Sequence, residues 1–331
     1  MKQISIIIPV YNVAKYLEKC INSTYNQELT ENEFEIIAVD DESPDDSLQV
    51  LNEIKKNHFN IRVISQKNKG LGGARNTGLL NASGEYILFL DADDYYIENS
   101  LKEIYTIAKD SSLDILEFGA QGVDISEKIV YETAISNNYT IQSGIHHYNN
   151  LKYMNSACNK LYKRSFLEEN KLFFVEKIYG EDFEFNTRAL YLAKRTMAIS
   201  NIVAKFLQSE ESITRSNDIE KKRKYANDFI DILQRIDSFR LNFENDKSEG
   251  HDQFFNERMS ILNVDLFYIT FKNNFPISEI LTLKDILKSK GVFRTNYSIS
   301  DKKKNLFRMV FLNFNFLFFR TALMLKKTFK I

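Results

Sequence analysis

Three aspartates stand together at the end of the apolar run Tyr86–Leu90: Asp91, Asp93 and Asp94. Carboxylates packed this closely repel one another unless a cation lies among them, and hard divalent cations prefer oxygen ligands. Since Mg²⁺ commonly takes one or two protein carboxylates and fills its other positions with phosphate oxygens and water, this strand end suits a metal bound to a nucleotide diphosphate. A solvated turn with Asp94 as a helix cap explains the motif equally well when it is taken alone.

A second acidic cluster, residues 40–45, follows the apolar run Phe34–Val39. One carboxylate at this position can accept the imide N–H of a uracil ring, and we assign that role to Asp40. The alternative is the N-cap of the following helix, for which Ser43 or Asp45 is suited. We expect both roles, with Asp40 binding and the later residues capping.

Residues 69–79 contain four glycines around Arg75. Glycines allow the backbone to approach a ligand closely, and the start of the following helix favours anions. Arg75 stands one turn into that helix, where it can meet a phosphate or a base carbonyl. Taken alone, a plain glycine-rich loop is the better interpretation of this segment.

Two further acids, Glu181 and Asp182, precede an apolar segment of helical period. Acidic residues are typical of the first turn of a helix. Their functional interpretation is a general base that removes a proton from an attacking hydroxyl.

The elements that must position these residues alternate along the first 120 residues. Expected strands cover residues 4–8, 34–39, 61–65, 85–90 and 114–118. Helical periodicity is found over residues 16–21, 48–54 and 97–108. Such alternation predicts an α/β fold with an open parallel sheet, whose ligands bind beyond the carboxyl ends of the strands. Tyr11, Asp40 and Asp91–Asp94 are therefore expected along one edge.

Charge is unevenly distributed along the chain. The net charge is −1, but residues 301–331 carry eight Lys and Arg against one Asp. The rest of the chain is therefore acidic, which argues against nucleic-acid binding. Cys20 and Cys158 form no metal-binding pattern, and the apolar run after Met1 is too short for a signal peptide, so a cytoplasmic protein with reduced thiols is expected.

The basic tail also contains apolar residues over 306–325, interrupted by Arg308 and Arg320. A charge at the bilayer centre costs about 2.5–3.5 kcal/mol, which disfavours a spanning helix. We expect an interfacial helix on an anionic membrane surface. A helix docked on the protein itself or on another subunit is the alternative.

Over residues 3–215 the chain resembles the family 2 glycosyltransferases, because five motifs occur in the order and spacing of that family. They are Ser5–Asn12, Val39–Ser43, Gly73–Gly78, Asp91–Asp94 and Glu181-Asp182. The resemblance implies a GT-A fold and inversion at the anomeric carbon, and it is greatest to bacterial enzymes that build capsule, exopolysaccharide and lipooligosaccharide.

The resemblance also implies which residues hold the nucleotide. Pro9 and Tyr11 would line the nucleoside pocket, Asp40 would bind the uracil, and Arg75 would lie near the base and phosphates. Relatives often carry Tyr-Arg shortly before Ser-Ile-Thr, but this chain has Phe206-Leu207-Gln208 there. The role of that arginine toward the leaving diphosphate passes to Arg215 or is absent.

For the chemistry, the resemblance implies that Asp91 contacts the ribose or sugar and that Asp93, with Asp91, ligates Mn²⁺ or Mg²⁺. Asp182 would be the general base, with Glu181 as the second choice.

In domain terms we expect a catalytic domain over residues 1–215, a helical appendage over 216–300 and the tail over 301–331. Residues 1–120 would bind the nucleotide-sugar and 121–215 the acceptor.

These observations together predict transfer of a hexose or N-acetylhexosamine from a UDP-sugar to a hydroxyl of a glycan or lipid-linked acceptor. The protein would act at the inner face of the cell membrane. The sequence is compatible with a monomer or with a homo-oligomer. The alternatives are a non-catalytic scaffold that binds nucleotide-sugars and a polyol-phosphate transferase on the same fold.

Overall fold

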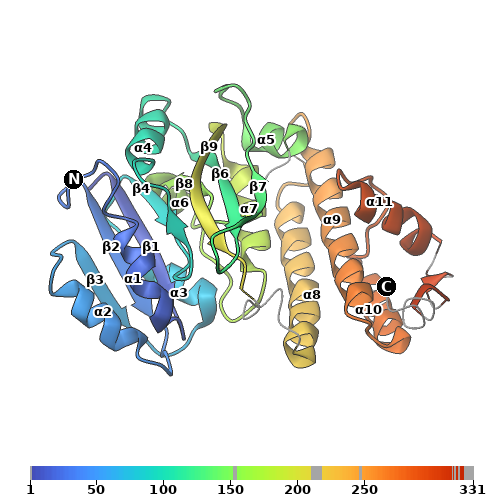
Figure 1. The fold of residues 1–331 in the computed structure, drawn as a ribbon. Helices are drawn as coiled ribbons and strands as arrows, with labels where there is room; N and C mark the ends of the chain where they lie inside the picture. The colour runs from blue at the N-terminus through green and yellow to red at the C-terminus, as the bar shows by residue number, and fades with distance from the viewer. Residues whose placement is uncertain are drawn as a thin grey trace. The chain divides into compact units, whose positions relative to one another are not determined.

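The computed structural model describes residues 2–151, 155–209, 218–245 and 248–323 apart from 315, 317 and 320. The chain divides into two compact units, Met1–Asn217 and Asp218–Ile331 (Figure 1).

The first unit is built on one mixed sheet. Its strands are β1 (Ile4–Val10), β2 (Phe34–Asp40), β3 (Ile61–Ser65), β4 (Tyr86–Phe89), β5 (Tyr95–Tyr96), β6 (Ile115–Val123), β7 (Ile129–Thr133), β8 (Lys160–Lys163) and β9 (Thr196–Leu207). The spatial order is β3-β2-β1-β4-β8-β6-β9-β5, and β7 pairs with β6.

The first four strands in this order run parallel, whereas β8 runs antiparallel to both of its neighbours, β4 and β6. The carboxyl ends of β1, β2 and β4 therefore meet the amino end of β8 at one edge of the sheet. This arrangement brings residues 10–12, 40–43, 91–94 and 157–160 to the same edge, although they are far apart in sequence.

The strands predicted over the first 120 residues are all present, with ends that differ by a few residues. Residues of β1, β2 and β4 are buried along their whole length, as expected for apolar runs in a parallel sheet. Pro9 is tolerated inside β1 because β4 pairs only with Ile4–Ile7, so the missing N–H lies beyond the end of that ladder.

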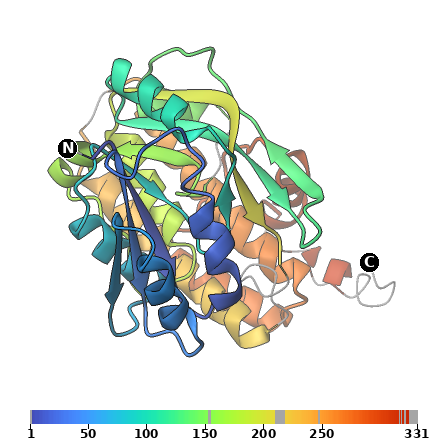
Figure 2. The ribbon, with the colours of Figure 1, turned by 60° about the vertical axis from the view of Figure 1, so that its left-hand side comes forward.

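Helices connect the strands and cover the sheet (Figure 2). They are α1 (Ala14–Asn22), α2 (Ser47–Lys55), α3 (Gly70–Leu80), α4 (Leu101–Asp110), α5 (Gly144–Asn150), α6 (Arg164–Glu169) and α7 (Glu181–Leu192). The helix predicted from residue 97 begins at Leu101 instead. Residues before it are held extended, because Tyr95 and Tyr96 pair with β9 and the Ile97 N–H donates to the Val203 carbonyl.

The glycines of α3 serve packing within the chain. A Cβ at Gly78 would lie 2.3 Å from Cγ2 of Ile7 on β1, and one at Gly72 would lie 2.4 Å from the Val175 carbonyl oxygen. Both positions exclude any larger residue. At these two glycines, the atoms that approach the backbone closely belong to Ile7 and Val175 of the same chain.

The second unit is helical, with α8 (Ile219–Leu241), α9 (His251–Lys272), α10 (Ile277–Ser289), α11 (Lys302–Phe307) and a π-helical turn η1 (Arg308–Leu312). The Asp218 carboxylate caps α8 by accepting from the Glu220 and Lys221 N–H groups. Within the described part of the chain, none of the helices combines the length and the apolar character needed to cross a bilayer.

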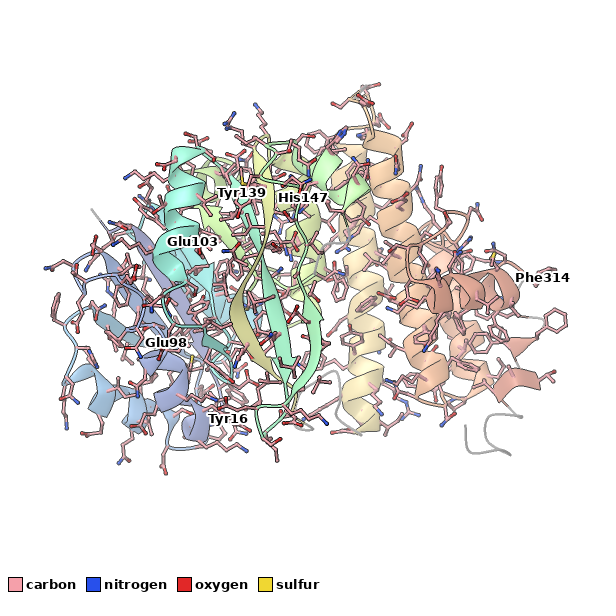
Figure 3. The ribbon with its side chains drawn as sticks, turned by 45° about the horizontal axis from the view of Figure 1, so that its top comes forward. Tyr16, Glu98, Glu103, Tyr139, His147 and Phe314 are labelled. Carbon is pink, nitrogen blue, oxygen red and sulfur yellow. The ribbon has the colours of Figure 1, made fainter. Side chains whose placement is uncertain are left out.

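The apolar residues of the tail divide into two groups. Phe307 and Phe319 are buried and contact Phe271 of α9, at ring-centroid distances of 5.5 and 5.4 Å. Phe314 and Phe318 are exposed, and Phe314 projects outward in Figure 3. Part of the tail is therefore docked on its own unit, which was the alternative to an interfacial helix, and part presents apolar side chains at the surface.

Candidate active site

The turn after β4 separates its three aspartates into different environments. Asp94 is buried and accepts from the Leu207 N–H at 2.8 Å, which ties the turn to the end of β9. Asp93 is partly exposed and lines a cavity of about 200 Å³. Asp91 accepts from Arg75, so it belongs to a second group of charges.

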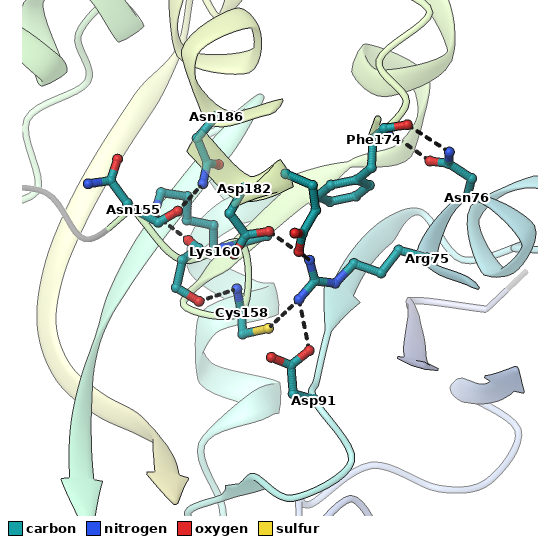
Figure 4. Close-up of polar contacts among 12 residues, drawn as sticks. Arg75, Asn76, Asp91, Asn155, Cys158, Lys160, Phe174, Asp182 and Asn186 are labelled. Atoms are coloured by element: carbon teal, nitrogen blue, oxygen red, sulfur yellow. Dashed lines mark hydrogen bonds and ion pairs between the residues drawn. The ribbon is translucent and has the colours of Figure 1, made fainter. Parts of the chain in front are cut away.

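Arg75 joins three carboxylates that come from two distant segments of the chain (Figure 4). Its Nη1 donates to Glu181 Oε1 and to Asp182 Oδ1, both at 2.7 Å, and its Nη2 donates to Asp91 Oδ1 at 2.8 Å. The Arg75 side chain is only 1% exposed. A guanidinium presents several donors in a fixed plane, which a lysine at this position could not reproduce.

The neighbouring Asn76 fixes the segment that packs over Arg75. Its side-chain amide donates to the Phe174 carbonyl and accepts from the Phe174 N–H, at 2.9 and 2.8 Å. The Phe174 ring consequently lies over the guanidinium, 5.1 Å from the ring centroid. The Arg-Asn pair of this motif thus has a structural role in holding the site together.

Charge in this group is unbalanced, since one guanidinium faces three carboxylates. Burial raises the pKa of Glu181, and the charge of neighbouring Asp182 raises it further. Burial also raises the pKa of Asp182, although the Arg75 charge opposes this. Both carboxyl groups therefore hold a proton to higher pH than ordinary acids do, which is typical of groups that exchange protons in catalysis.

Asp182 is oriented by the backbone as well as by Arg75. Gly180 is the N-cap of α7 and has a φ of 81°, a left-handed conformation that suits glycine. The Ala157 N–H then donates to Asp182 Oδ2 at 2.9 Å. Each carboxylate oxygen of Asp182 thus has a defined donor.

The residues expected to hold a nucleoside lie at the ends of β1 and β2. Pro9 is buried, whereas Tyr11 is 52% exposed. Asp40 is buried, and its oxygens accept from the Ser43 N–H at 3.3 Å and from Ser65 Oγ at 3.2 Å. A carboxylate with one long bond to each oxygen retains lone pairs that can accept a ligand N–H.

The N-cap of α2 is Asp46, not Ser43 or Asp45 as the sequence suggested, but the Asp45 carboxylate accepts from the first N–H group of two helices. These are the Ser47 N–H at the start of α2 and the Ala14 N–H at the start of α1.

Two arginines, Arg75 and Arg215, were expected near the nucleotide. Arg75 lies among the carboxylates of Asp91, Glu181 and Asp182, because burial of its charge requires anionic partners. Its expected place near the base and phosphates stays a prediction. Arg215 lies outside the described residues.

The acidic residues after β4 fit a cation that is held mainly by its substrate. Within the described residues, no three His, Cys, Asp or Glu side chains form a group that would hold a metal by themselves. Asp93, on the wall of the cavity, would supply one carboxylate, and Asp91 would supply a second. That number is what Mg²⁺ commonly takes from a protein when phosphate oxygens and water complete its coordination.

A buried polar cluster behind Asp182 was missed by the sequence analysis. It comprises Glu117 on β6, His147 on α5, and Asn159 and Lys160 at the start of β8. The sequence did contain one signal for this cluster: Glu117 stands inside the otherwise apolar part of the predicted strand over residues 114–118.

The family model described as Glycosyl transferase family 2 matches residues 5–170. The chain is 33% identical over 202 residues to the poly(ribitol-phosphate) beta-glucosyltransferase of Bacillus spizizenii, covering 60% of this chain and 31% of that protein. It is 31% identical over 217 residues to the uncharacterized glycosyltransferase EpsJ of Bacillus subtilis, covering 64% and 62%. The chain thus spans less than two thirds of the length of these curated relatives.

Among solved structures, the chain resembles S. aureus TarS 1-349 in complex with UDP-GlcNAc, with a TM-score of 0.57 and 22% identity over 88% of this chain and 90% of that one. This similarity confirms the fold: a GT-A sheet followed by a helical C-terminal extension.

Proposed function

The chain belongs to glycosyltransferase family 2, and on that premise we propose that it transfers a hexose or N-acetylhexosamine from a UDP-sugar to a hydroxyl of a glycan or lipid-linked acceptor in bacterial surface polysaccharide synthesis. The observation that carries the proposal is the bond pattern of Arg75. Arg75 binds both Asp182 of α7 and Asp91 at the end of β4. The proposed base therefore lies beside the edge of the sheet at which we propose that the donor binds.

The nature of the relatives supports the choice of substrates. The S. aureus TarS structure is in complex with UDP-GlcNAc, which supports a UDP-sugar donor. The Bacillus spizizenii relative is a poly(ribitol-phosphate) beta-glucosyltransferase, which supports a hydroxyl of a surface polymer as acceptor. Tyr11 and Asp40 would receive the nucleoside, with the Asp40 carboxylate accepting the uracil imide N–H.

Transfer then proceeds in one displacement. The acceptor hydroxyl oxygen attacks the anomeric carbon, and the Asp182 carboxylate takes the hydroxyl proton. The bond between the anomeric carbon and the diphosphate oxygen breaks, and its electron pair leaves with UDP. Attack from the face opposite UDP inverts the anomeric centre.

Asp93 and Asp91 are the residues that would hold Mn²⁺ or Mg²⁺, which supplies charge stabilisation to the departing diphosphate when bound. Arg75 acts through its partners by keeping Asp91 and Asp182 at a fixed separation.

The second unit supports attachment to an anionic membrane surface at the cytoplasmic face. Among the described residues of the tail, four large apolar side chains and two lysines are exposed: Leu306, Met309, Phe314, Phe318, Lys302 and Lys303. Apolar side chains that enter the interface beside cations that face anionic headgroups are typical of peripheral membrane segments.

The test is release of UDP from a panel of UDP-sugars with Mn²⁺ and a lipid-linked acceptor. The proposal predicts acceptor-dependent release of UDP from at least one donor. Binding of UDP without any release would instead support the scaffold, and a donor that transfers a polyol phosphate would support the third alternative.

A further inference from the structure

Lys160 is completely buried at the start of β8, next to the proposed active site. Its Nζ donates to the Ser156 carbonyl at 2.9 Å and to Asn159 Oδ1 at 2.8 Å, and it lies 3.6 Å from Glu117 Oε1. Glu117 in turn lies 2.7 Å from His147 Nε2. A buried ammonium group is costly unless such partners surround it, so the burial of Lys160 depends on these contacts.

The Ser156 carbonyl belongs to a short segment, residues 155–158, that contacts the first turns of α7 (Figure 4). The Ala157 N–H donates to Asp182 Oδ2 at 2.9 Å, and the Asn155 carbonyl accepts from Asn186 Nδ2 at 2.6 Å. Lys160 binds the carbonyl of the peptide unit that joins Ser156 to Ala157, and the N–H of that unit makes the contact with Asp182. Since Ser156 and Ala157 share that peptide unit, fixing the carbonyl oxygen also fixes the direction of the N–H.

Burial lowers the pKa of Lys160, and the charges of Glu117 and Asp182 oppose this. In the part of the chain that the structure describes, the other charged or titratable groups near Asp182 include Arg75 of α3, Asp91 after β4, Glu181 of α7, and Cys158 and Tyr162 beside or within β8. Among the described residues, Arg75 and Lys160 are the cations near the three carboxylates of Asp91, Glu181 and Asp182.

We propose that Lys160 is a positioning residue for the general base: by holding the Ser156 carbonyl it aims the Ala157 N–H at Asp182 and keeps that carboxylate in the orientation that transfer requires. This inference rests on the proposed function for its catalytic consequence. It does not require Lys160 to touch donor, acceptor or metal.

The first experiment measures the segment itself by hydrogen–deuterium exchange on the full chain. Lys160→Met keeps the apolar stem and removes the donors, and it should speed exchange of the amides of residues 155–158 by about 10-fold or more. Lys163→Met, on the same strand but at its partly exposed end, is the matched control and should leave this exchange unchanged. Unaltered exchange of residues 155–158 in Lys160→Met would overturn the proposal.

The second experiment separates positioning from general destabilisation. Lys160→Met should lower kcat for UDP release by about 10²-fold, the effect expected of a slightly misplaced catalytic group, with the Kd of UDP within about twofold of wild type. In an Asp182→Asn background the same change should cost less than about twofold, because both act on one step. The inference would be contradicted if the double variant lost kcat by the product of the two single losses. It would also be contradicted if Lys160→Met weakened UDP binding as much as it lowered kcat.

If Lys160→Met does not fold, Lys160→Gln replaces it, because the amide keeps a neutral donor in the same space. Lys160→Gln should change amide exchange and kcat in the same directions but by smaller factors. A wild-type protein that released UDP from no UDP-sugar would overturn the proposed function, and the exchange experiment would still decide whether Lys160 holds residues 155–158.

Discussion

Replacing Arg75 by Met should destabilise the first unit to an extent that follows from the burial of its partners. Removing one member of a buried ion pair costs about 3–5 kcal/mol. The side chains of Arg75 and Glu181 are 1% and 6% exposed, but those of Asp182 and Asp91 are 18% and 33% exposed and retain water. We therefore expect the lower end, about 3 kcal/mol. At roughly 2–4 °C per kcal/mol, Tm should fall by about 6–12 °C.

The loss of stability should depend on pH in a defined direction. The Arg75 charge lowers the pKa of Glu181 and of Asp182, which burial raises. Without it both values rise further above those of the unfolded chain. A carboxyl group with a raised folded-state pKa favours folding at low pH, and this contribution is lost as pH rises through that pKa. The deficit of Arg75→Met should thus be larger at about pH 8 than at about pH 5.

Thermal unfolding followed by circular dichroism at both pH values measures the effect. The matched control is Arg235→Met, which breaks the surface pair with Asp231 and should cost only about 0.3–0.5 kcal/mol with little change between the two pH values. The reasoning is refuted if Arg75→Met melts like the wild type at both pH values, or if its deficit grows toward acid.

Three further predictions address the donor site and the tail. Asp93→Ala should abolish transfer and weaken UDP binding in Mn²⁺, since the diphosphate loses its bridging cation; full wild-type activity in excess EDTA would argue against this. Asp40→Ala should raise the donor KM and reduce the preference for UDP over other nucleotides, whereas calorimetry with unchanged UDP affinity would make Asp40 only a turn residue. Exchange of Phe314 and Phe318 for Ser should reduce co-sedimentation with anionic vesicles while leaving the fold intact, because both side chains are exposed; unchanged co-sedimentation would speak against membrane contact.

The exposed pair is a sharper probe of the tail than deletion of residues 301–331. Deletion would also remove Phe307 and Phe319, which are buried against α9. A deleted protein could then fail to fold for reasons unrelated to any membrane.

The first half of the fold could be predicted from the sequence because its signals are local. Apolar runs of strand length alternate with helical periods through residue 120, and acidic residues follow directly on the buried strands. The sheet edge that gathers Asp40 and Asp91 follows from parallel pairing alone.

The interior of the site could not be predicted in the same way. The bonds of Arg75 to Glu181 and Asp182 join residues 106 and 107 positions apart. No local pattern encodes such a contact, so the sequence indicated only that Arg75 can meet a phosphate or a base carbonyl. The role of Gly78 depends on the distance to Ile7 across the helix–sheet interface, which is again a tertiary property.

The central claim is that Asp182 is the base of an inverting displacement, and steady-state turnover of Asp182→Asn tests it most directly. The amide keeps the shape of the side chain and removes its basicity, so kcat should fall by about 10²–10⁴ with the Kd of UDP little changed. Glu184→Gln, two residues further along α7 and paired with Arg188, is the matched control and should retain most of the activity. Near-wild-type turnover by Asp182→Asn would contradict the account.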